Sequence, residues 1–186
     1  MDRRRDRTAD AKRKLVNRNL TVSALRMPDP VENENTTAEL IEKYVNMAAA
    51  SGIENVIVRA EAQVSFDVLD EKIALALKRA EASDVNVLFE TVGFLARTEN
   101  VLNIINHFAS AAIGASWNVR GTYFDAGETA ETTIKNLGAY IKHVHIKDSV
   151  VENDEIKYRL IGEGTLPLGT MIRALDSVNY DGFLSY

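Results

Sequence analysis

The chain has 186 residues, of which 46% are hydrophobic and 26% are charged, and its formal net charge is −5. These values are typical of one soluble globular domain and exclude a disordered or collagen-like chain. No apolar run reaches the roughly 18 residues of a membrane helix, so we expect a cytoplasmic protein with no membrane partner. The absence of cysteine excludes disulfides, thiolate metal sites and cysteine nucleophiles, so any metal must be held by His, Asp, Glu or Asn.

The start of the chain is basic although the whole chain is acidic. Residues 1–18 hold eight Arg and Lys side chains against three Asp. A basic tail can bind nucleic acid, but here the arginines are interleaved with aspartates, no aromatic side chain is available for base stacking, and the acidic remainder would repel phosphate. We therefore expect a disordered basic tail over residues 1–9, a solvated helix over residues 10–17 and no nucleic-acid partner. A nucleic-acid binder that uses this tail is the alternative.

Beyond residue 17, short β-rich runs alternate with longer runs of helical period. In chain order, strands are predicted at residues 20–25, 55–60, 85–90, 112–118, 141–147 and 183–186. Helices are predicted between them: from a capping box at Thr36 and Glu39 to Gly52, over residues 67–82, from Thr98 to Phe108, and over residues 130–137 and 168–178.

Strands and helices that alternate about every 30 residues predict βαβ units, hence an α/β fold in which helices cover a parallel sheet. The chain contains no linker or low-complexity segment, so residues 1–186 are predicted to form a single domain. The order of elements fits both a closed (β/α) barrel and an open sheet. In both, ligands bind beyond the carboxyl ends of the strands, which makes the polar residues at those ends the first candidates for a site.

Four polar residues stand at matching ends of consecutive predicted strands: Glu90, Asn118, His145 and Lys147. Charged groups at the end of an apolar strand must be solvated, paired or bound, because burying them alone costs several kcal/mol. His143, His145 and Lys147 also share one face by the period of two. We therefore expect one concave site to collect the four strand-end residues.

Three further residues carry two interpretations each. Arg59 ends another apolar strand and is expected either to bind a phosphate or carboxylate or to form an ion pair with Glu61 or Glu90. Trp117 is out of phase with the polar strand end, so we expect it to pack under a helix rather than to stack on a ligand. His107 is expected to be a surface or helix-packing residue.

Three tracts in the last third of the chain carry a resemblance to a known family. They read IKHVHIKD over residues 141–148, LIGEGTLP over residues 160–167 and YDGFLSY over residues 180–186. Together they resemble the closing third of the xylose-isomerase-like superfamily, which contains sugar and sugar-phosphate isomerases and epimerases and endonuclease IV. The resemblance implies a (β/α) barrel of the TIM type whose divalent metal is held by Glu, Asp, His and Glu from four strand ends.

Carried over to this sequence, the resemblance implies a partial metal site. Glu90 stands at the first Glu ligand, which is also an acid/base, and His145 stands at the imidazole ligand. Asn118, in the tract SWNVRGTY, stands where the family has the ligand Asp, while Arg120 and Gly121 replace two histidines; the final Glu normally follows the tract YDGFLSY. Because Glu90, Asn118 and His145 offer a single negative charge to Mn, Mg, Co or Zn, weak or absent metal binding is expected.

The same resemblance implies roles for the site residues. Glu90 and Lys147 are expected to be catalytic, Glu90 as a base and Lys147 as the group that stabilises an oxyanion or a phosphate. The expected metal ligands are Glu90, Asn118 and His145. Substrate contacts are expected from a wider set: Arg59, Arg120, His143, Lys147 and Asp148.

The function implied is metal-dependent isomerisation or epimerisation of a small sugar or sugar phosphate through an enediolate. The alternative is a catalytically inactive barrel fragment that acts as a binding or subunit-interaction protein. Endonuclease IV chemistry is disfavoured because residues 156–158 offer no zinc ligand. Since an eight-stranded barrel typically needs about 250 residues, the six strands are expected to be the third through eighth of an incomplete barrel, which a homo-oligomer or a partner chain would complete.

Overall fold

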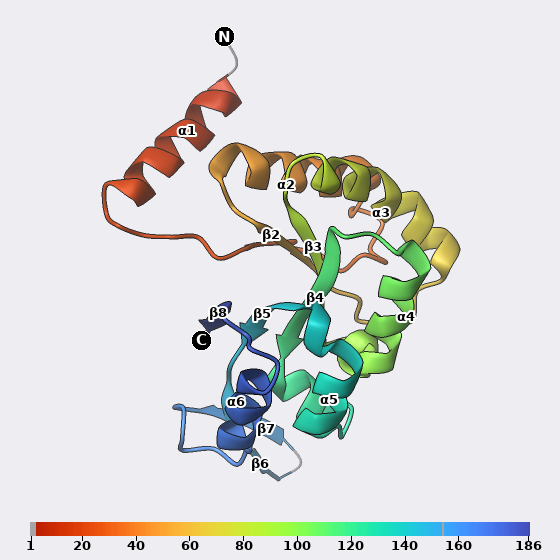
Figure 1. The fold of residues 1–186 in the computed structure, drawn as a ribbon, viewed down its shortest axis with the longest axis vertical. Coiled ribbons are helices and arrows are strands. Elements are labelled where there is room, and N and C mark those ends of the chain that lie inside the picture. The colour runs from red at the N-terminus through yellow and green to blue at the C-terminus, as the bar shows by residue number, and fades with distance from the viewer. Residues whose placement is uncertain (1–2, 154) are drawn as a thin grey trace.

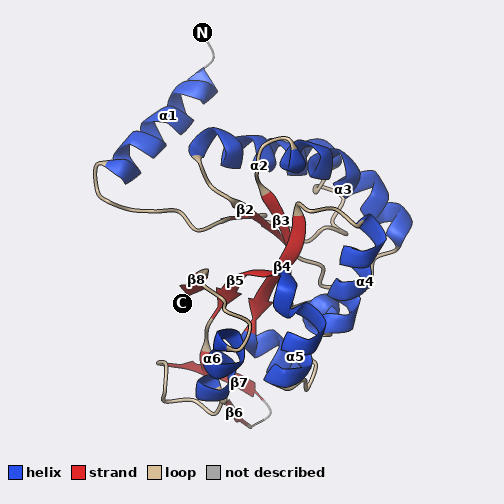
Figure 2. Ribbon diagram, in the orientation of Figure 1, coloured by secondary structure: helices blue, strands red, loops and turns tan. Residues whose placement is uncertain are grey.

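The computed structural model describes residues 3–153 and 155–186. Six parallel strands form one sheet in the order β1-β2-β3-β4-β5-β8. The sheet curls into a half-barrel, and the helices follow one another round its outer side (Figure 1, Figure 2). The alternation of strands and helices predicted the parallel α/β sheet, and the family resemblance together with the number of strands predicted the incomplete (β/α) barrel that the structure shows. The strands are β1 (Leu25–Arg26), β2 (Asn55–Val58), β3 (Asn86–Glu90), β4 (Ile113–Asn118), β5 (Ile141–His145) and β8 (Phe183–Ser185).

The helices that cover the sheet begin and end close to their predicted positions. They are α2 (Ala38–Ser51), α3 (Phe66–Glu81), α4 (Thr98–Phe108), α5 (Ala130–Leu137) and α6 (Leu168–Asp176). The hydroxyls of Thr37, Ser65 and Thr129 each accept the backbone N–H three residues on, which stabilises the first turn of α2, α3 and α5. Gly52, with a φ of 70°, ends α2. The capping residue predicted for α2, Thr36, is wrong by one position.

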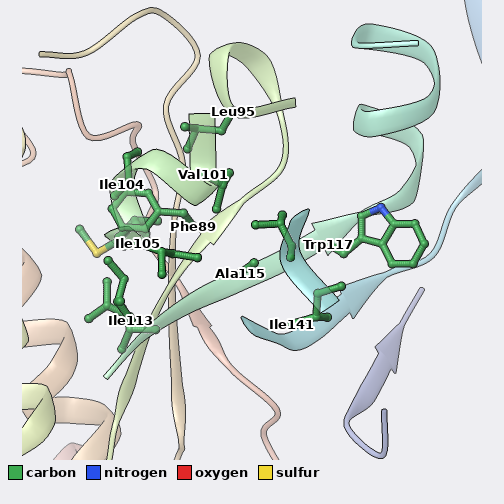
Figure 3. Packing of buried hydrophobic residues seen from close by; sticks show 14 of the residues in the cluster. Phe89, Leu95, Val101, Ile104, Ile105, Ile113, Ala115, Trp117 and Ile141 are labelled. Atoms are coloured by element: carbon green, nitrogen blue, oxygen red, sulfur yellow. The ribbon is translucent and has the colours of Figure 1, made fainter. Parts of the chain in front are cut away.

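The hydrophobic core lies between the sheet and the helices. Alternate side chains of a strand point to opposite faces, so Phe89 and Trp117 face the helices and are fully buried (Figure 3). The indole N–H of Trp117 donates to the hydroxyl of Thr122 at 2.9 Å. The prediction that Trp117 packs on the helix side is therefore confirmed. The next residue of each strand, Glu90 or Asn118, points to the inner side of the half-barrel.

The first strand is shorter than predicted and lies later in the sequence. Strand β1 pairs with β2 through Leu25 and Arg26 only, whereas residues 20–24 run extended without a strand partner. Because Leu25 lies opposite Val56, residues 20–23 lie beyond Asn55, the first residue of β2. The Asn55 side chain instead donates to the backbone carbonyl of Ser23 at 3.1 Å.

An antiparallel hairpin follows β5 and was not predicted. It consists of β6 (Asp148–Glu152) and β7 (Glu155–Arg159), with Asp148 opposite Arg159. Glu152 holds its strands together through Lys157 at 3.2 Å and Arg159 at 2.6 Å. Such a charged segment lacks the apolar alternation from which strands are recognised.

The basic start of the chain is helical where the structure describes it. Residues 1–2 of the expected tail lie outside the described residues, and α1 (Arg3–Val16) begins well before the helix expected over residues 10–17. Ion pairs at helical spacing, such as Asp10 with Arg13 at 2.8 Å, favour this helix. Figure 1 shows α1 at the edge of the half-barrel, joined to β1 by a long connection, and α1 contacts α2. No helix in residues 3–153 and 155–186 is long and apolar enough to cross a membrane.

Candidate functional site

Glu90, the last residue of β3, is the centre of the site, and its side chain is only 2% exposed. Its Oε2 accepts a hydrogen bond from Nε of Arg26 at 2.8 Å and lies 2.8 Å from Nη2 of the same guanidinium. Its Oε1 lies 3.0 Å from the side-chain amide nitrogen of Asn118 and 2.9 Å from Nδ1 of His145. Four nitrogen atoms from β1, β4 and β5 therefore converge on one buried carboxylate.

These contacts decide the charge of Glu90. Burial alone raises the pKa of Glu90, but the hydrogen bonds from His145 and Asn118, and the attraction of His145 and Arg26, outweigh burial and lower the pKa to about 2. The carboxylate is therefore ionised at neutral pH and only accepts hydrogen bonds. It follows that Nδ1 of His145 carries its hydrogen on the side of Glu90, which leaves Nε2 as the other functional atom of the ring.

The expected metal ligands, Glu90, Asn118 and His145, do not fit a divalent cation. A carboxylate has about four lone-pair positions; Glu90 uses three of them for hydrogen bonds, and Nη2 of Arg26 lies a further 2.8 Å from Oε2. Asn118 turns its NH₂ group to Glu90, while its oxygen accepts the backbone N–H of Gly121 at 3.1 Å. Within residues 3–153 and 155–186, no three His, Asp or Glu side chains form a group that could hold a metal ion. Donors that converge on an anion are the reverse of a metal site, where acceptors converge on a cation.

A pocket of about 500 Å³ lies over this cluster at the carboxyl ends of the strands. Its volume is within the range of small-molecule sites. Besides Arg26, Glu90, Asn118 and His145, its lining includes Arg120, Asp125, Lys147, Tyr158, Ser185 and Tyr186. The structure thus brings together the four residues that were selected at the ends of predicted strands, and Arg120 lines the same pocket. The four residues are Glu90, Asn118, His145 and Lys147.

The cations of the pocket differ in how they are paired. Arg120 forms two hydrogen bonds with Asp125, at 3.1 and 2.9 Å. Lys147, by contrast, forms no ion pair with any residue of the described chain, and its Nζ lies 5.3 Å from the ring centroid of Tyr158 on the hairpin. Lys147 is therefore the cation of this pocket that is available to an anionic group of a ligand.

Arg59 does not line the pocket. Its guanidinium donates to the backbone carbonyls of Met27 at 3.0 Å and Pro28 at 2.7 Å, and its Nε donates to Glu61 at 3.1 Å. Of the two interpretations, the ion pair with Glu61 is the one that the structure shows. The residue ties the chain after β1 to the chain after β2.

Asp148, for which a substrate contact is expected, holds a loop in this structure. Its Oδ2 accepts the backbone N–H groups of Gly162 and Gly164 at 2.9 Å each, and its Oδ1 accepts that of Ser149 at 2.9 Å. A Cβ atom at Gly164 would overlap the carboxylate, so this close approach requires glycine. Burial raises the pKa of Asp148, but the backbone N–H groups, Gly164 first, outweigh burial and lower it.

His143 lies behind His145, outside the pocket lining. It is buried, and its Nε2 lies 3.0 Å from the hydroxyl of Ser185 and 3.2 Å from that of Ser23. Burial and the nearby His145 lower the pKa of His143 to about 4, although Glu90 opposes them, so the ring is neutral at pH 7. Its contacts join β5 to β8 and to the segment before β1.

His107 lies far from the pocket, on α4. Its Nε2 is 2.7 Å from Asp70 of α3, and its ring stacks on Phe66 with centroids 4.3 Å apart. The side chain is partly exposed. The prediction of a surface and helix-packing histidine is confirmed.

Sequence reasoning missed several residues of the pocket lining, among them Arg26, Tyr158 and Ser185. Arg26 directly follows the strand expected at residues 20–25, so the strand-end rule would have selected it had the strand's register been known. Ser185 alternates with Leu184 along β8 and lies opposite His145 on the neighbouring strand. Tyr158 belongs to the hairpin that was not predicted, and no signal in the sequence marks it.

Comparison with known proteins places these observations in a family. The family model described as "Xylose isomerase-like TIM barrel" matches residues 2–186. No curated protein matches the chain. Among solved structures, a xylose isomerase domain protein from Planctomyces limnophilus superposes with a TM-score of 0.78 at 14% identity, over 97% of this chain and 75% of that chain.

Two further structures are similar. The 3-keto-D-glucoside 4-epimerase from E. coli gives a TM-score of 0.79 at 15% identity, over 98% of this chain and 77% of that chain. A D-tagatose 3-epimerase-like protein gives 0.77 at 20% identity, over 96% of this chain and 74% of that chain. Similarity at such identities supports the fold alone, whereas the family model spans nearly the whole sequence. The chain therefore belongs to the xylose isomerase-like TIM barrel family.

Proposed function

We propose that this chain binds a monosaccharide-sized sugar or sugar phosphate in the pocket over Glu90, without a divalent metal. The observation that carries the proposal is the hydrogen-bonded cluster of Glu90, Arg26, Asn118 and His145 at the floor of a pocket of about 500 Å³. A similar solved structure, D-allulose 3-epimerase from Methylomonas sp., is a complex with D-allulose, with a TM-score of 0.74 and 15% identity. It supports a sugar as the class of ligand.

The groups that face the pocket suit a sugar. Sugar hydroxyls both donate and accept hydrogen bonds, and the pocket offers N–H groups of Arg26, the imidazole of His145 and the hydroxyl of Ser185. Tyr158 offers an aromatic surface to the apolar face of a sugar ring. Lys147 is positioned for a phosphate or a carboxylate that the sugar carries.

The state of Glu90 favours binding over turnover. A general base works best with a pKa near the working pH, and a carboxylate with a pKa of about 2 is a weak base. Both of its oxygens also accept hydrogen bonds already, and Nη2 of Arg26 lies against Oε2, so a proton from substrate would have to displace one of these contacts. We therefore favour a binding protein built on an isomerase and epimerase fold.

Sugar isomerisation or epimerisation is the second candidate. It is favoured by the 2.9 Å contact between Glu90 and His145 at the strand ends, with Lys147 in the same pocket. For Glu90 to take a proton from carbon, the ligand would have to draw Arg26 away from Oε2, and Lys147 would stabilise the oxyanion that forms. The two candidates share the pocket but differ in whether a C–H bond breaks.

A ligand panel tests the proposal. D-Allulose, D-tagatose and L-ribulose, with their phosphates, are titrated into the chain by calorimetry, and the sugar C–H signals are followed by NMR in D₂O. We expect saturable binding without exchange of carbon-bound hydrogen. Lys147→Met should weaken a sugar phosphate about tenfold, while Lys157→Met, on the hairpin but outside the pocket lining, should not. No binding by any ligand contradicts the proposal, and exchange of hydrogen at carbon favours the second candidate.

A further inference from the structure

Arg26 is the cation that contacts the buried carboxylate of the site. Strand β1 lies beside β2, and β2 lies beside β3, so the Arg26 side chain reaches past one strand to meet Glu90 at the end of the next. Both Nε and Nη2 lie 2.8 Å from Oε2. This contact crosses the inner face of the half-barrel at the level where the family's metal would bind.

The charge of Glu90 requires a partner. A buried carboxylate without compensation is costly, by several kcal/mol after relaxation, and its side chain is 2% exposed. Asn118 is neutral, and Arg120 is paired with Asp125. Lys147 forms no ion pair in the described chain. His145 also lies 2.9 Å from Glu90, but an imidazole is charged only when it is protonated. Arg26 is therefore the permanent charge that balances Glu90, the role that a divalent cation would otherwise have in a barrel of this family.

Arg26 also keeps capacity for a ligand. A guanidinium has five N–H groups in a rigid fork, and only those on Nε and Nη2 face Glu90. Its side chain is 47% exposed and lines the pocket. The remaining N–H groups can therefore donate to oxygen atoms of a bound molecule while the pair with Glu90 stays intact.

We infer that Arg26 is a built-in cation that takes the place of the divalent metal: it neutralises Glu90, fills the acceptor positions that a metal would need, and presents its free N–H groups to the ligand. The inference rests on the proposed function only in its last part, the contact with a sugar. Its first part concerns metal alone. If Arg26 stands in for a metal, its removal should leave an anionic pocket that recruits one.

Mn²⁺ titration of Arg26→Met tests this replacement. We expect Arg26→Met to bind Mn²⁺ at least about tenfold more tightly than the parent chain does, measured by calorimetry and by the paramagnetic relaxation of water. Mn²⁺ should also raise the thermal midpoint of Arg26→Met and leave that of the parent unchanged. Na⁺ at matched ionic strength should do neither.

Four variants test whether a gain in Mn²⁺ affinity comes from the removal of Arg26 beside Glu90. Arg26→Lys keeps the charge and should gain no affinity for Mn²⁺. Arg120→Met removes another cation of the same pocket and should gain none, because its partner is Asp125 and not Glu90. Glu90→Gln in the Arg26→Met background should abolish the gain. Arg26→Gln repeats the test with a side chain that keeps hydrogen-bond donors, should Arg26→Met fail to fold.

The outcomes separate the inference from the proposed function. Mn²⁺ affinity of the parent equal to that of Arg26→Met overturns the inference, and so does a folded Arg26→Met or Arg26→Gln that gains no affinity. A gain that survives Glu90→Gln overturns it as well, since the metal would then bind elsewhere. Sugar binding by the parent chain is measured apart from metal, so its absence defeats the proposed function and leaves the replacement of the metal by Arg26 standing.

Discussion

Asp148 is a carboxylate whose role differs from the one its position in the sequence suggested. It follows Lys147 and is the first residue of β6, yet both of its oxygens bind backbone N–H groups of the hairpin and of the loop that holds Gly162 and Gly164. Because it is 1% exposed, water cannot replace these contacts. The residue supports the wall of the pocket rather than its ligand.

Replacing Asp148 by asparagine tests this role. The amide keeps the shape but presents an NH₂ group to backbone N–H groups, so Asp148→Asn should lower the free energy of unfolding by about 2 kcal/mol. Chemical denaturation measures the loss. Asp176→Asn, at an exposed carboxylate on α6, should have almost no effect. Equal effects of the two variants would contradict the role assigned to Asp148.

The same residue has a predictable dependence on pH. Its pKa is lowered in the folded chain from the ordinary value of 3.8, so its stabilisation is fully present above pH 3.8 and is lost as the pH falls below it. Denaturation of the parent chain between pH 6 and pH 3 should therefore show a loss near the acid end that Asp148→Asn lacks. A variant and a parent with the same pH profile would contradict this assignment.

How much of the site could be predicted differs from residue to residue. Glu90, Asn118 and His145 were predictable as neighbours, because parallel strands end at one edge and alternate residues share a face. Which way the Asn118 amide turns was not predictable, since it depends on the backbone N–H of Gly121. Arg26 was missed because its place depends on the register of a two-residue strand.

At the scale of elements, the long helices were the most predictable parts. Apolar residues at helical spacing and short polar caps located α3, α4 and α5 to within about a residue or two. The hairpin β6–β7 was not predictable, because ion pairs through Glu152 hold it together where an apolar face would leave a periodic pattern. Tyr158 lies on that hairpin, so its place in the site was not predictable either.

The pairing of β1 illustrates a second limit. The apolar run at residues 20–25 predicted a strand, yet only Leu25 and Arg26 have a partner on β2. The length of an apolar run indicates which residues are buried. Strand pairing also requires backbone of a neighbouring strand opposite each of these residues. Because the paired residues lie later than expected, Arg26 belongs to β1 and lines the pocket.

At the scale of the whole molecule, the half-barrel leaves the outer edge of β8 without a strand in the described chain. β8 pairs with β5 on one side, and its side chains Phe183 and Leu184 are 46% and 50% exposed. An apolar edge strand is a template for pairing with another chain. The unpaired edge of β8 therefore favours assembly with another chain.

We expect concentration-dependent self-association through this edge. Leu184→Lys places a charge on β8 and should weaken association at least about tenfold, as measured by sedimentation velocity over a range of concentrations. Leu160→Lys is the matched control, because Leu160 is 63% exposed and lies in a loop outside the sheet. A parent chain that sediments as a monomer at every concentration, or an equal effect of both variants, would contradict assembly through β8.

Sugar binding in the pocket over Glu90 is expected to be independent of divalent metal. Both oxygens of Glu90 accept hydrogen bonds, and Arg26 balances the charge of the carboxylate, so a ligand should need no divalent ion. The most direct measurement is the dissociation constant of one sugar of the panel in the presence of EDTA and again with Mn²⁺. We predict two values that agree within about twofold, since no coupling links the two ligands. Sugar binding that appears only with Mn²⁺ would contradict a metal-independent pocket.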